Sequence, residues 1–97
     1  MKKGYWVVAY RAISEESATK AYAELAVPAI ESFAGRFLAR TSIKSTRTKQ
    51  ACSNELSLSN FDSYEIALAA YESEVYKKAL KALGSGAERD FRIVEGA

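Results

Sequence analysis

Three tyrosines and two arginines are the residues of this sequence best suited to form a binding site. Tyr22 falls in one amphipathic segment, and Tyr71 and Tyr76 fall in another, so all three phenols lie on or beside apolar stripes. Most buried tyrosines are core residues whose hydroxyl finds a partner, and that is our leading interpretation. The alternative is a small ligand pocket lined by these phenols, in which Arg36 or Arg40 fixes a carboxylate.

Missing residue types exclude several chemistries. The 97 residues include no histidine, which removes His-dependent nucleophile triads and most zinc and iron sites. We therefore expect neither a metal nor a cofactor. Cys52 is the single cysteine and cannot form an internal disulfide, which suits a reducing, cytoplasmic compartment. The GSG at 84–86 is not followed by the Lys and Ser/Thr of a phosphate-binding loop.

A basic run in the middle of the chain contains Arg40, Lys44, Arg47 and Lys49 and no acid. Such charges can neutralise the phosphates of a nucleic acid, but a solvated hairpin tip is the simpler interpretation. RNA-recognition modules need an aromatic motif on their third strand, and SNELSLSNF contains no such motif. Because the net charge is only +2, we expect no nucleic-acid partner.

The elements that position these residues can be predicted from composition and periodicity. Residues 5–10, YWVVAY, are aromatic and β-branched and predict a strand. Ser14 is a candidate N-cap for a helix that ends near Gly35, and Pro28 should kink it. The expected buried stripe of this helix consists of Ala18, Ala21, Tyr22, Leu25, Ala29 and Phe33.

The remaining elements are three further strands and a second helix. Residues 36–40 and 89–94 read as strands, and Leu56 and Leu58 alternate with serines in a weaker strand ending at Phe61. Asp62 or Ser63 caps a helix that ends at Gly84. Its expected buried stripe consists of Tyr64, Ala67, Leu68, Tyr71, Val75, Ala79 and Leu83.

The order β-α-β-β-α-β predicts an α+β, ferredoxin-like fold, with two helices on one face of a four-stranded antiparallel sheet, as a single domain over residues 1–97. The other sheet face would leave large apolar side chains in water, which monomers rarely do. We therefore expect a homodimer that pairs two sheets face to face. No apolar run reaches the roughly 20 residues of a membrane span, so we expect no membrane association.

Several segments together resemble the bacterial family catalogued as domain of unknown function 1330. They are GYWVVAY, AYAELAVPAI, GRFLAR, FDSYEIALAAYES with Tyr76 following, and DFRIVEG, which cover residues 4–40 and 61–96. The resemblance implies a dimeric α/β barrel of the ferredoxin-like kind and no settled reaction. In related cofactor-free monooxygenases and isomerases the pocket lies between sheet and helices. Family members often carry a proline that breaks the second helix, where this chain has Glu74.

Residues 41–60 depart from the family pattern. Codons for Ser53–Phe61, read one nucleotide out of frame, can spell Gln-Arg-Thr-Phe-Val-Val-Glu-Phe, which suits the family's third strand. Residues 43–46 can spell Gln-Val-His-Glu, which would restore one histidine. A compensated frameshift is our preferred hypothesis, and a genuine variant is the other. If the written residues are real, Ser57 and Ser59 replace packing residues, and each buried hydroxyl needs a partner or costs roughly 1–3 kcal/mol.

Three functions remain open from the sequence. The first is a homodimer that binds a small acidic or aromatic molecule between sheet and helices. The second is a cofactor-independent enzyme, monooxygenase- or isomerase-like, acting on such a molecule with a tyrosine or carboxylate as proton carrier. The third is a structural or partner-binding dimer without a ligand. A cavity of about 300 Å³ or more with convergent tyrosine and arginine groups would favour the first two.

Overall fold

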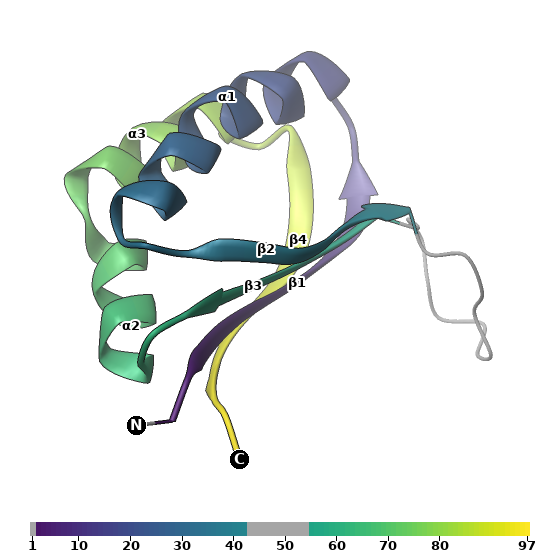
Figure 1. Ribbon diagram of the computed structural model, residues 1–97. Helices are drawn as coiled ribbons and strands as arrows, with labels where there is room; N and C mark the ends of the chain where they lie inside the picture. Colours follow the sequence, from purple (N-terminus) through teal and green to yellow (C-terminus); the bar gives the residue numbers. More distant parts are fainter. Residues whose placement is uncertain (1, 43–54) are drawn as a thin grey trace, which may run out of the picture.

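The computed structural model of the protein describes residues 2–42 and 55–97 (Figure 1). The elements are β1 Gly4–Ile13, α1 Glu16–Ser32, β2 Arg36–Ser42, β3 Glu55–Phe61, α2 Tyr64–Glu72, α3 Glu74–Leu83 and β4 Ala87–Glu95. The predicted order of elements is confirmed, with one difference: the second helical segment is divided into α2 and α3.

The four strands form one antiparallel sheet in the order β2-β3-β1-β4. All three helices cover the same face of this sheet, and the two chain ends lie side by side (Figure 1). This arrangement confirms the predicted ferredoxin-like fold. Strands β1 and β4 pair along their length, from Gly4 opposite Glu95 to Ile13 opposite Ala87.

Alternation along the strands divides the side chains between two faces. On β1, Trp6 and Val8 are buried beneath the helices, while Tyr5, Val7 and Ala9 point to the opposite face and are half-exposed. We call this opposite side the bare face. It also carries Leu58 and Val94 from the neighbouring strands. Leu38 lies at a register irregularity of β2 between Phe37 and Ala39 and is 53% exposed.

Helix α1 begins one residue later than predicted. Its N-cap is Glu15, which makes no side-chain capping bond. The hydroxyl of Ser14 instead donates to the carbonyl oxygens of Ser85 and Gly86, at 3.3 and 3.2 Å. The predicted N-cap role of Ser14 was therefore wrong, because the side chain ties the start of α1 to the turn before β4. The helix continues through Pro28 to Ser32.

The end of α1 is formed by Ala34 rather than by Gly35. Ala34 has φ 58°, the left-handed conformation that favours glycine. Its N–H donates to the carbonyl of Glu31 and that of Gly35 to the carbonyl of Ile30, both at 3.0 Å. These two bonds are those of a Schellman motif, in which the residue at the left-handed position is usually glycine.

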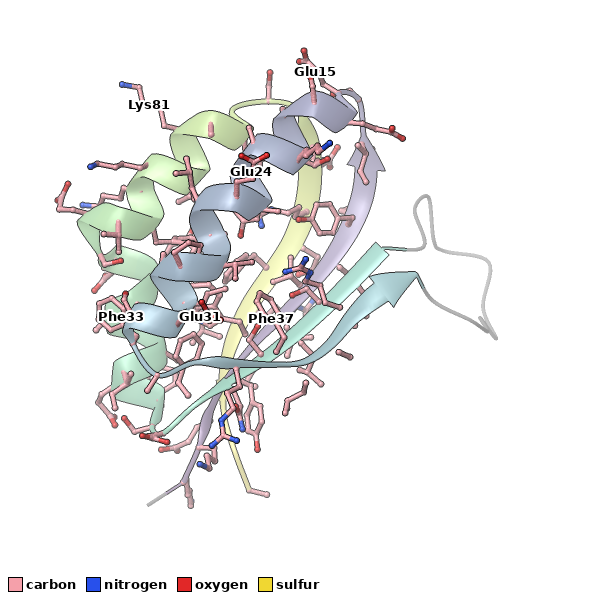
Figure 2. The ribbon with its side chains drawn as sticks, turned by 45° about the horizontal axis from the view of Figure 1, so that its top comes forward. Glu15, Glu24, Glu31, Phe33, Phe37 and Lys81 are labelled. Carbon is pink, nitrogen blue, oxygen red and sulfur yellow. The ribbon has the colours of Figure 1, made fainter. Side chains whose placement is uncertain are left out.

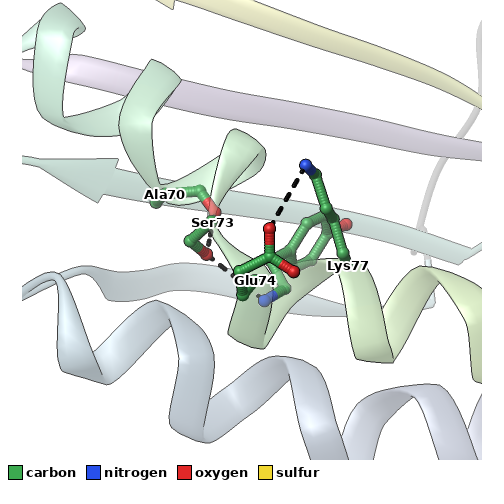
Figure 3. A network of polar contacts seen from close by, with 5 residues as sticks. Ala70, Ser73, Glu74 and Lys77 are labelled. Atoms are coloured by element: carbon green, nitrogen blue, oxygen red, sulfur yellow. Dashed lines mark hydrogen bonds and ion pairs between the residues drawn. The ribbon is translucent and has the colours of Figure 1, made fainter.

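Ser73 separates α2 from α3 without a proline (Figure 3). Its hydroxyl donates to the carbonyl of Ala70 at 2.7 Å and accepts the N–H of Tyr76 at 3.2 Å, so one side chain closes one helix and opens the next. Glu74 and Lys77 add an exposed ion pair in the first turn of α3. Ser63 caps α2 in the same way, accepting the N–H of Ile66, whereas Asp62 pairs with Lys3.

The break at Ser73 changes which residues of the second stripe are buried. Tyr76, Ala79 and Leu83 of α3 are buried, whereas Val75 is 45% exposed. On α1 the buried face likewise differs from the predicted one, since Leu25 is largely exposed. The buried apolar residues are Trp6, Val8, Tyr22, Ala26, Ala29, Ile30, Phe61, Ala67, Ala70, Tyr76, Ala79 and Leu83.

Strand β3 forms from the residues as written. Its partners are β1 and β2, and Trp6 and Phe37 both lie opposite Ser59. Ser59 is fully buried, and its hydroxyl has no hydrogen-bond partner among residues 2–42 and 55–97, as expected for a serine in a packing position. The frameshift hypothesis concerns residues 41–60. Most of them, residues 43–54, lie outside the described residues.

Candidate functional site

A cavity of about 430 Å³ lies between α1 and the helix-covered face of the sheet. It exists because α1 packs along α3 rather than directly on the strands, and large side chains from β1 and β2 fill only part of the space beneath it. Phe37 is one of these side chains (Figure 2). The lining residues are Trp6, Val8, Tyr10, Ile13, Glu16, Thr19, Lys20, Tyr22, Ala23, Ala26, Val27, Ile30, Phe37, Arg40, Leu56, Ser57 and Arg89.

Arg89 of β4 brings a half-buried positive charge to the cavity. Its guanidinium carbon lies 4.7 Å from the ring centre of Tyr22, 5.2 Å from that of Phe91 and 5.7 Å from that of Tyr10. Within the part of the chain that the structure describes, Arg89 forms no ion pair. Aromatic ring faces stabilise a cation without cancelling its charge, so this charge remains available to a ligand.

Two phenols from different helices meet beside Arg89. The hydroxyls of Tyr22 on α1 and Tyr76 on α3 are 2.6 Å apart. Burial, reinforced by the neighbouring Tyr22, raises the pKa of Tyr76, so this phenol is protonated at neutral pH. Burial opposes the charge of Arg89, but the nearby phenols outweigh it and leave the pKa of the guanidinium raised. Arg89 is therefore cationic next to a neutral partner.

The remaining charges at the cavity are mostly positive. Arg40 of β2 lies with its guanidinium carbon 4.9 Å from the ring centre of Phe37 and forms no ion pair with any described residue. Lys20 and Glu16 project from the first turns of α1. Three cations therefore face one carboxylate among the lining residues, and such a concave, electropositive site attracts anions.

Trp6 forms the rigid floor of the cavity. Its indole N–H donates to the carbonyl of Ala67 at 2.9 Å, and its ring packs against those of Phe61, Tyr76 and Phe91 at centroid distances of 5.0, 4.8 and 5.1 Å. It is the single tryptophan of the sequence. Its indole fluorescence therefore reports on the floor of the cavity and on the aromatic core around it.

The five candidate residues from the sequence occupy different places. Tyr22 and Arg40 line the cavity, and Tyr76 lies directly behind Tyr22. Tyr71 is half-buried in the same aromatic cluster, 5.0 Å from Phe91 and 5.4 Å from Tyr76 between ring centres, and is not a lining residue. Arg36 is exposed at the start of β2, opposite Asn60, and does not line the cavity.

Sequence reasoning did not include Arg89, Trp6, Tyr10 or Phe37 among the site candidates. A signal for Arg89 was present, because alternation along RDFRIV places Arg89 on the same face as Phe91 and Arg92 on the other. What the alternation could not show is which face the helices cover. The pairing of Tyr10 with Arg89 settles this, since it brings the guanidinium among the rings beneath α1.

Residues 2–42 and 55–97 contain no group of three or more His, Cys, Asp or Glu side chains placed to hold a metal ion. Among the helices that the structure describes, none is both long and apolar enough to cross a membrane.

Comparison with known proteins identifies a family for this chain. The sequence model described as Domain of unknown function (DUF1330) matches residues 3–97. Among curated proteins, none matches this chain.

Solved structures share the fold at low sequence identity. A protein of unknown function from Rhodopseudomonas palustris is 13% identical with a TM-score of 0.80, covering 99% of this chain and 83% of that one. SnoaB from Streptomyces nogalater, described as a cofactor-independent oxygenase, is 9% identical with a TM-score of 0.70, covering 100% and 95%. A dimeric ferredoxin-like protein of unknown function from Jannaschia is 14% identical with a TM-score of 0.66, covering 96% and 98%.

Proposed function

This chain belongs to the family described as Domain of unknown function (DUF1330), and from that premise we propose that it is a cytoplasmic homodimer that binds a small conjugated organic acid in the cavity between α1 and the sheet. The observation that carries the proposal is Arg89. Its charge is half-buried, lies against three ring faces and has no ion-pair partner among the described residues. A ligand carboxylate would supply the missing counter-charge.

The shape and lining of the cavity support a conjugated, planar ligand. Its volume of about 430 Å³ lies within the range of small-molecule sites. Trp6, Tyr10 and Phe37 offer aromatic surface against which a flat ring can stack. Arg40 and Arg89 lie on β2 and β4, the two edge strands of the sheet. A carboxylate held by Arg89 therefore leaves the rest of the ligand to the ring contacts.

The bare face of the sheet supports the dimer part of the proposal. Tyr5, Val7, Ala9 and Leu58 are half-exposed there, and Leu38 and Val94 are 53% and 40% exposed. A second copy packed face to face would remove this apolar surface from water. One fold neighbour is itself described as dimeric.

A thermal-shift experiment tests the ligand class. Benzoate, cinnamate and salicylate are compared with benzamide, cinnamamide and salicylamide, which match them in shape but carry no charge. We expect at least one acid to raise the melting temperature by several degrees while its amide does not, because the arginines favour the anion. If no acid raises it, or if each amide matches its acid, the proposal is wrong.

Catalysis on the same molecule is the second candidate. The specific observation in its favour is the Tyr22–Tyr76 hydroxyl pair at the cavity wall, which could carry a proton to a bound substrate. Chromatography of the bound acid after incubation with the protein distinguishes the two. Turnover that falls in Tyr22→Phe while binding persists supports an enzyme, and an unchanged acid supports a binder. A dimer without a ligand would leave both experiments negative.

A further inference from the structure

The partners of Arg89 are neutral. Buried and half-buried arginines in proteins are usually paired with a carboxylate, which orients the guanidinium but also cancels its charge. Here the neighbouring groups are the phenols of Tyr22 and Tyr76 and the rings of Tyr10 and Phe91. None of these carries a negative charge at neutral pH. The environment therefore holds the guanidinium in place and leaves its full charge facing the cavity.

Tyr76 is the fixed point of this arrangement, although it does not line the cavity. It is fully buried, and its ring packs against Trp6, Tyr71 and Tyr22 at centroid distances of 4.8, 5.4 and 6.0 Å. Its backbone N–H is held by the hydroxyl of Ser73 at the start of α3. The hydroxyl of Tyr22 meets this anchored phenol at 2.6 Å, which fixes the α1 wall of the cavity next to Arg89.

The direction of the phenol bond follows from burial. If Tyr22 donated to Tyr76, the hydrogen of Tyr76 would be left in the core without an acceptor, which costs roughly 1–3 kcal/mol. If Tyr76 donates, its hydrogen is satisfied. The hydrogen of Tyr22, a residue at the cavity wall, then remains available to a ligand oxygen. Arg89 and Tyr22 together thus present hydrogen-bond donors to one region of the cavity.

We propose that Tyr76 is a positioning residue: through its hydrogen bond to Tyr22 it holds a neutral phenol pair against Arg89, so that the site selects a deprotonated aryl or conjugated oxyanion over its protonated form. This inference rests on the proposed function and names the charged group of the ligand. Tyr76 acts through Tyr22 and Arg89 and does not touch the ligand.

The probe for this proposal is 4-nitrophenol, whose phenolate is yellow and which titrates near neutral pH. A site that prefers the phenolate lowers the apparent pKa of the bound probe. The other charged lining residues are Glu16, Lys20 and Arg40, and they are the same in every variant compared below. In the intact protein we expect a roughly tenfold preference for the phenolate, which lowers the apparent pKa of the probe by about one.

Tyr76→Phe removes one hydroxyl and keeps the ring. We expect it to reduce the preference for the phenolate by about threefold or more, because Tyr22 and Arg89 lose their fixed support. Tyr71→Phe is the matched control: it makes the same change in the same aromatic cluster, at a residue that does not contact Tyr22 through a hydroxyl bond. That variant should behave as the intact protein does. If Tyr76→Phe fails to fold, Tyr22→Phe tests the phenol pair as a whole, and an unchanged preference for the phenolate in that variant overturns the proposal.

The outcomes separate this proposal from the function on which it rests. If the intact protein binds neither form of the probe, the proposed function is contradicted. If the probe binds with an unchanged pKa, the proposed function stands and selection of the oxyanion is overturned. If Tyr71→Phe and Tyr76→Phe reduce the preference equally, the effect is one of packing, and the positioning role of Tyr76 is overturned.

Discussion

The hydroxyls of Tyr22 and Tyr76, 54 positions apart in the sequence, lie 2.6 Å from each other between α1 and α3. This contact joins the two helices that cover the sheet at the point where the core meets the cavity. Tyr76 is fully buried behind it and Tyr22 is 8% exposed in front. This one hydrogen bond therefore contributes to the stability of the fold and also fixes the geometry of the candidate site.

The buried phenol predicts a stability that falls at alkaline pH. The folded-state pKa of Tyr76 is raised by burial and by Tyr22, whereas an unfolded tyrosine ionises near pH 10. The contribution is thus fully present below about pH 10, and is lost as the pH rises above that value, since only the unfolded chain releases the proton. Urea unfolding across this range should show a steeper loss in the intact protein than in Tyr76→Phe. If the free energy of unfolding falls equally with pH in both proteins, the raised pKa of Tyr76 is contradicted.

Ser59 offers a stabilising substitution. Its hydroxyl is fully buried beside Trp6 and Phe37 and finds no hydrogen-bond partner in the part of the chain that the structure describes. Ser59→Ala removes the unsatisfied group and should raise the free energy of unfolding by about 1 kcal/mol. Ser57→Ala, on the same strand at a half-buried position, is the control and should change little. Destabilisation by Ser59→Ala would mean that the hydroxyl has a partner.

The left-handed position at the end of α1 offers a second stabilising substitution. Ala34 has φ 58°, which costs a residue with a Cβ roughly 1–2 kcal/mol. Ala34→Gly relieves this strain but adds chain entropy to the unfolded state, so a net gain of about 0.5–1 kcal/mol is expected in chemical denaturation. A loss of stability would show that the helix does not end in this conformation.

The bare face predicts a dimer that one charge disrupts. Leu38→Glu places a carboxylate in the proposed interface of each copy, where desolvation costs several kcal/mol. Light scattering after size exclusion should give a dimer for the intact protein and a monomer for this variant. Val75→Glu, on α3 and also about half exposed, should remain dimeric. A monomeric intact protein would contradict the assembly proposal.

Much of the fold could be predicted because local signals and tertiary packing agree. The strand composition of YWVVAY, the strand at RDFRIV, the two amphipathic segments and the order of elements predicted the observed antiparallel sheet. The helix ends were harder, because competing partners decide them. Ser14 bonds the turn before β4 instead of capping α1, and Ser73 breaks the second helix in place of a proline.

The candidate site was harder to predict, because a cavity is the space that side chains from several packed elements leave unfilled. Tyr22 and Arg40 reach the cavity as one sequence interpretation proposed. Arg89 depends on strand register and on which sheet face the helices cover, and neither can be read from local pattern. Tyr22 lines the cavity whereas Tyr76 is buried behind it. This difference likewise follows from the packing of α1 on α3.

The most direct test of the account is calorimetric titration of benzoate into the intact protein, Arg89→Gln and Arg92→Gln. Both variants remove one positive charge from β4, but Arg89 faces the cavity while Arg92 pairs with Asp90 on the bare face. We predict saturable binding that weakens at least tenfold, or about 1.4 kcal/mol, in Arg89→Gln and stays within about twofold in Arg92→Gln. Absence of binding to the intact protein, or equal losses in the two variants, would contradict the assignment of the cavity as an acid-binding site.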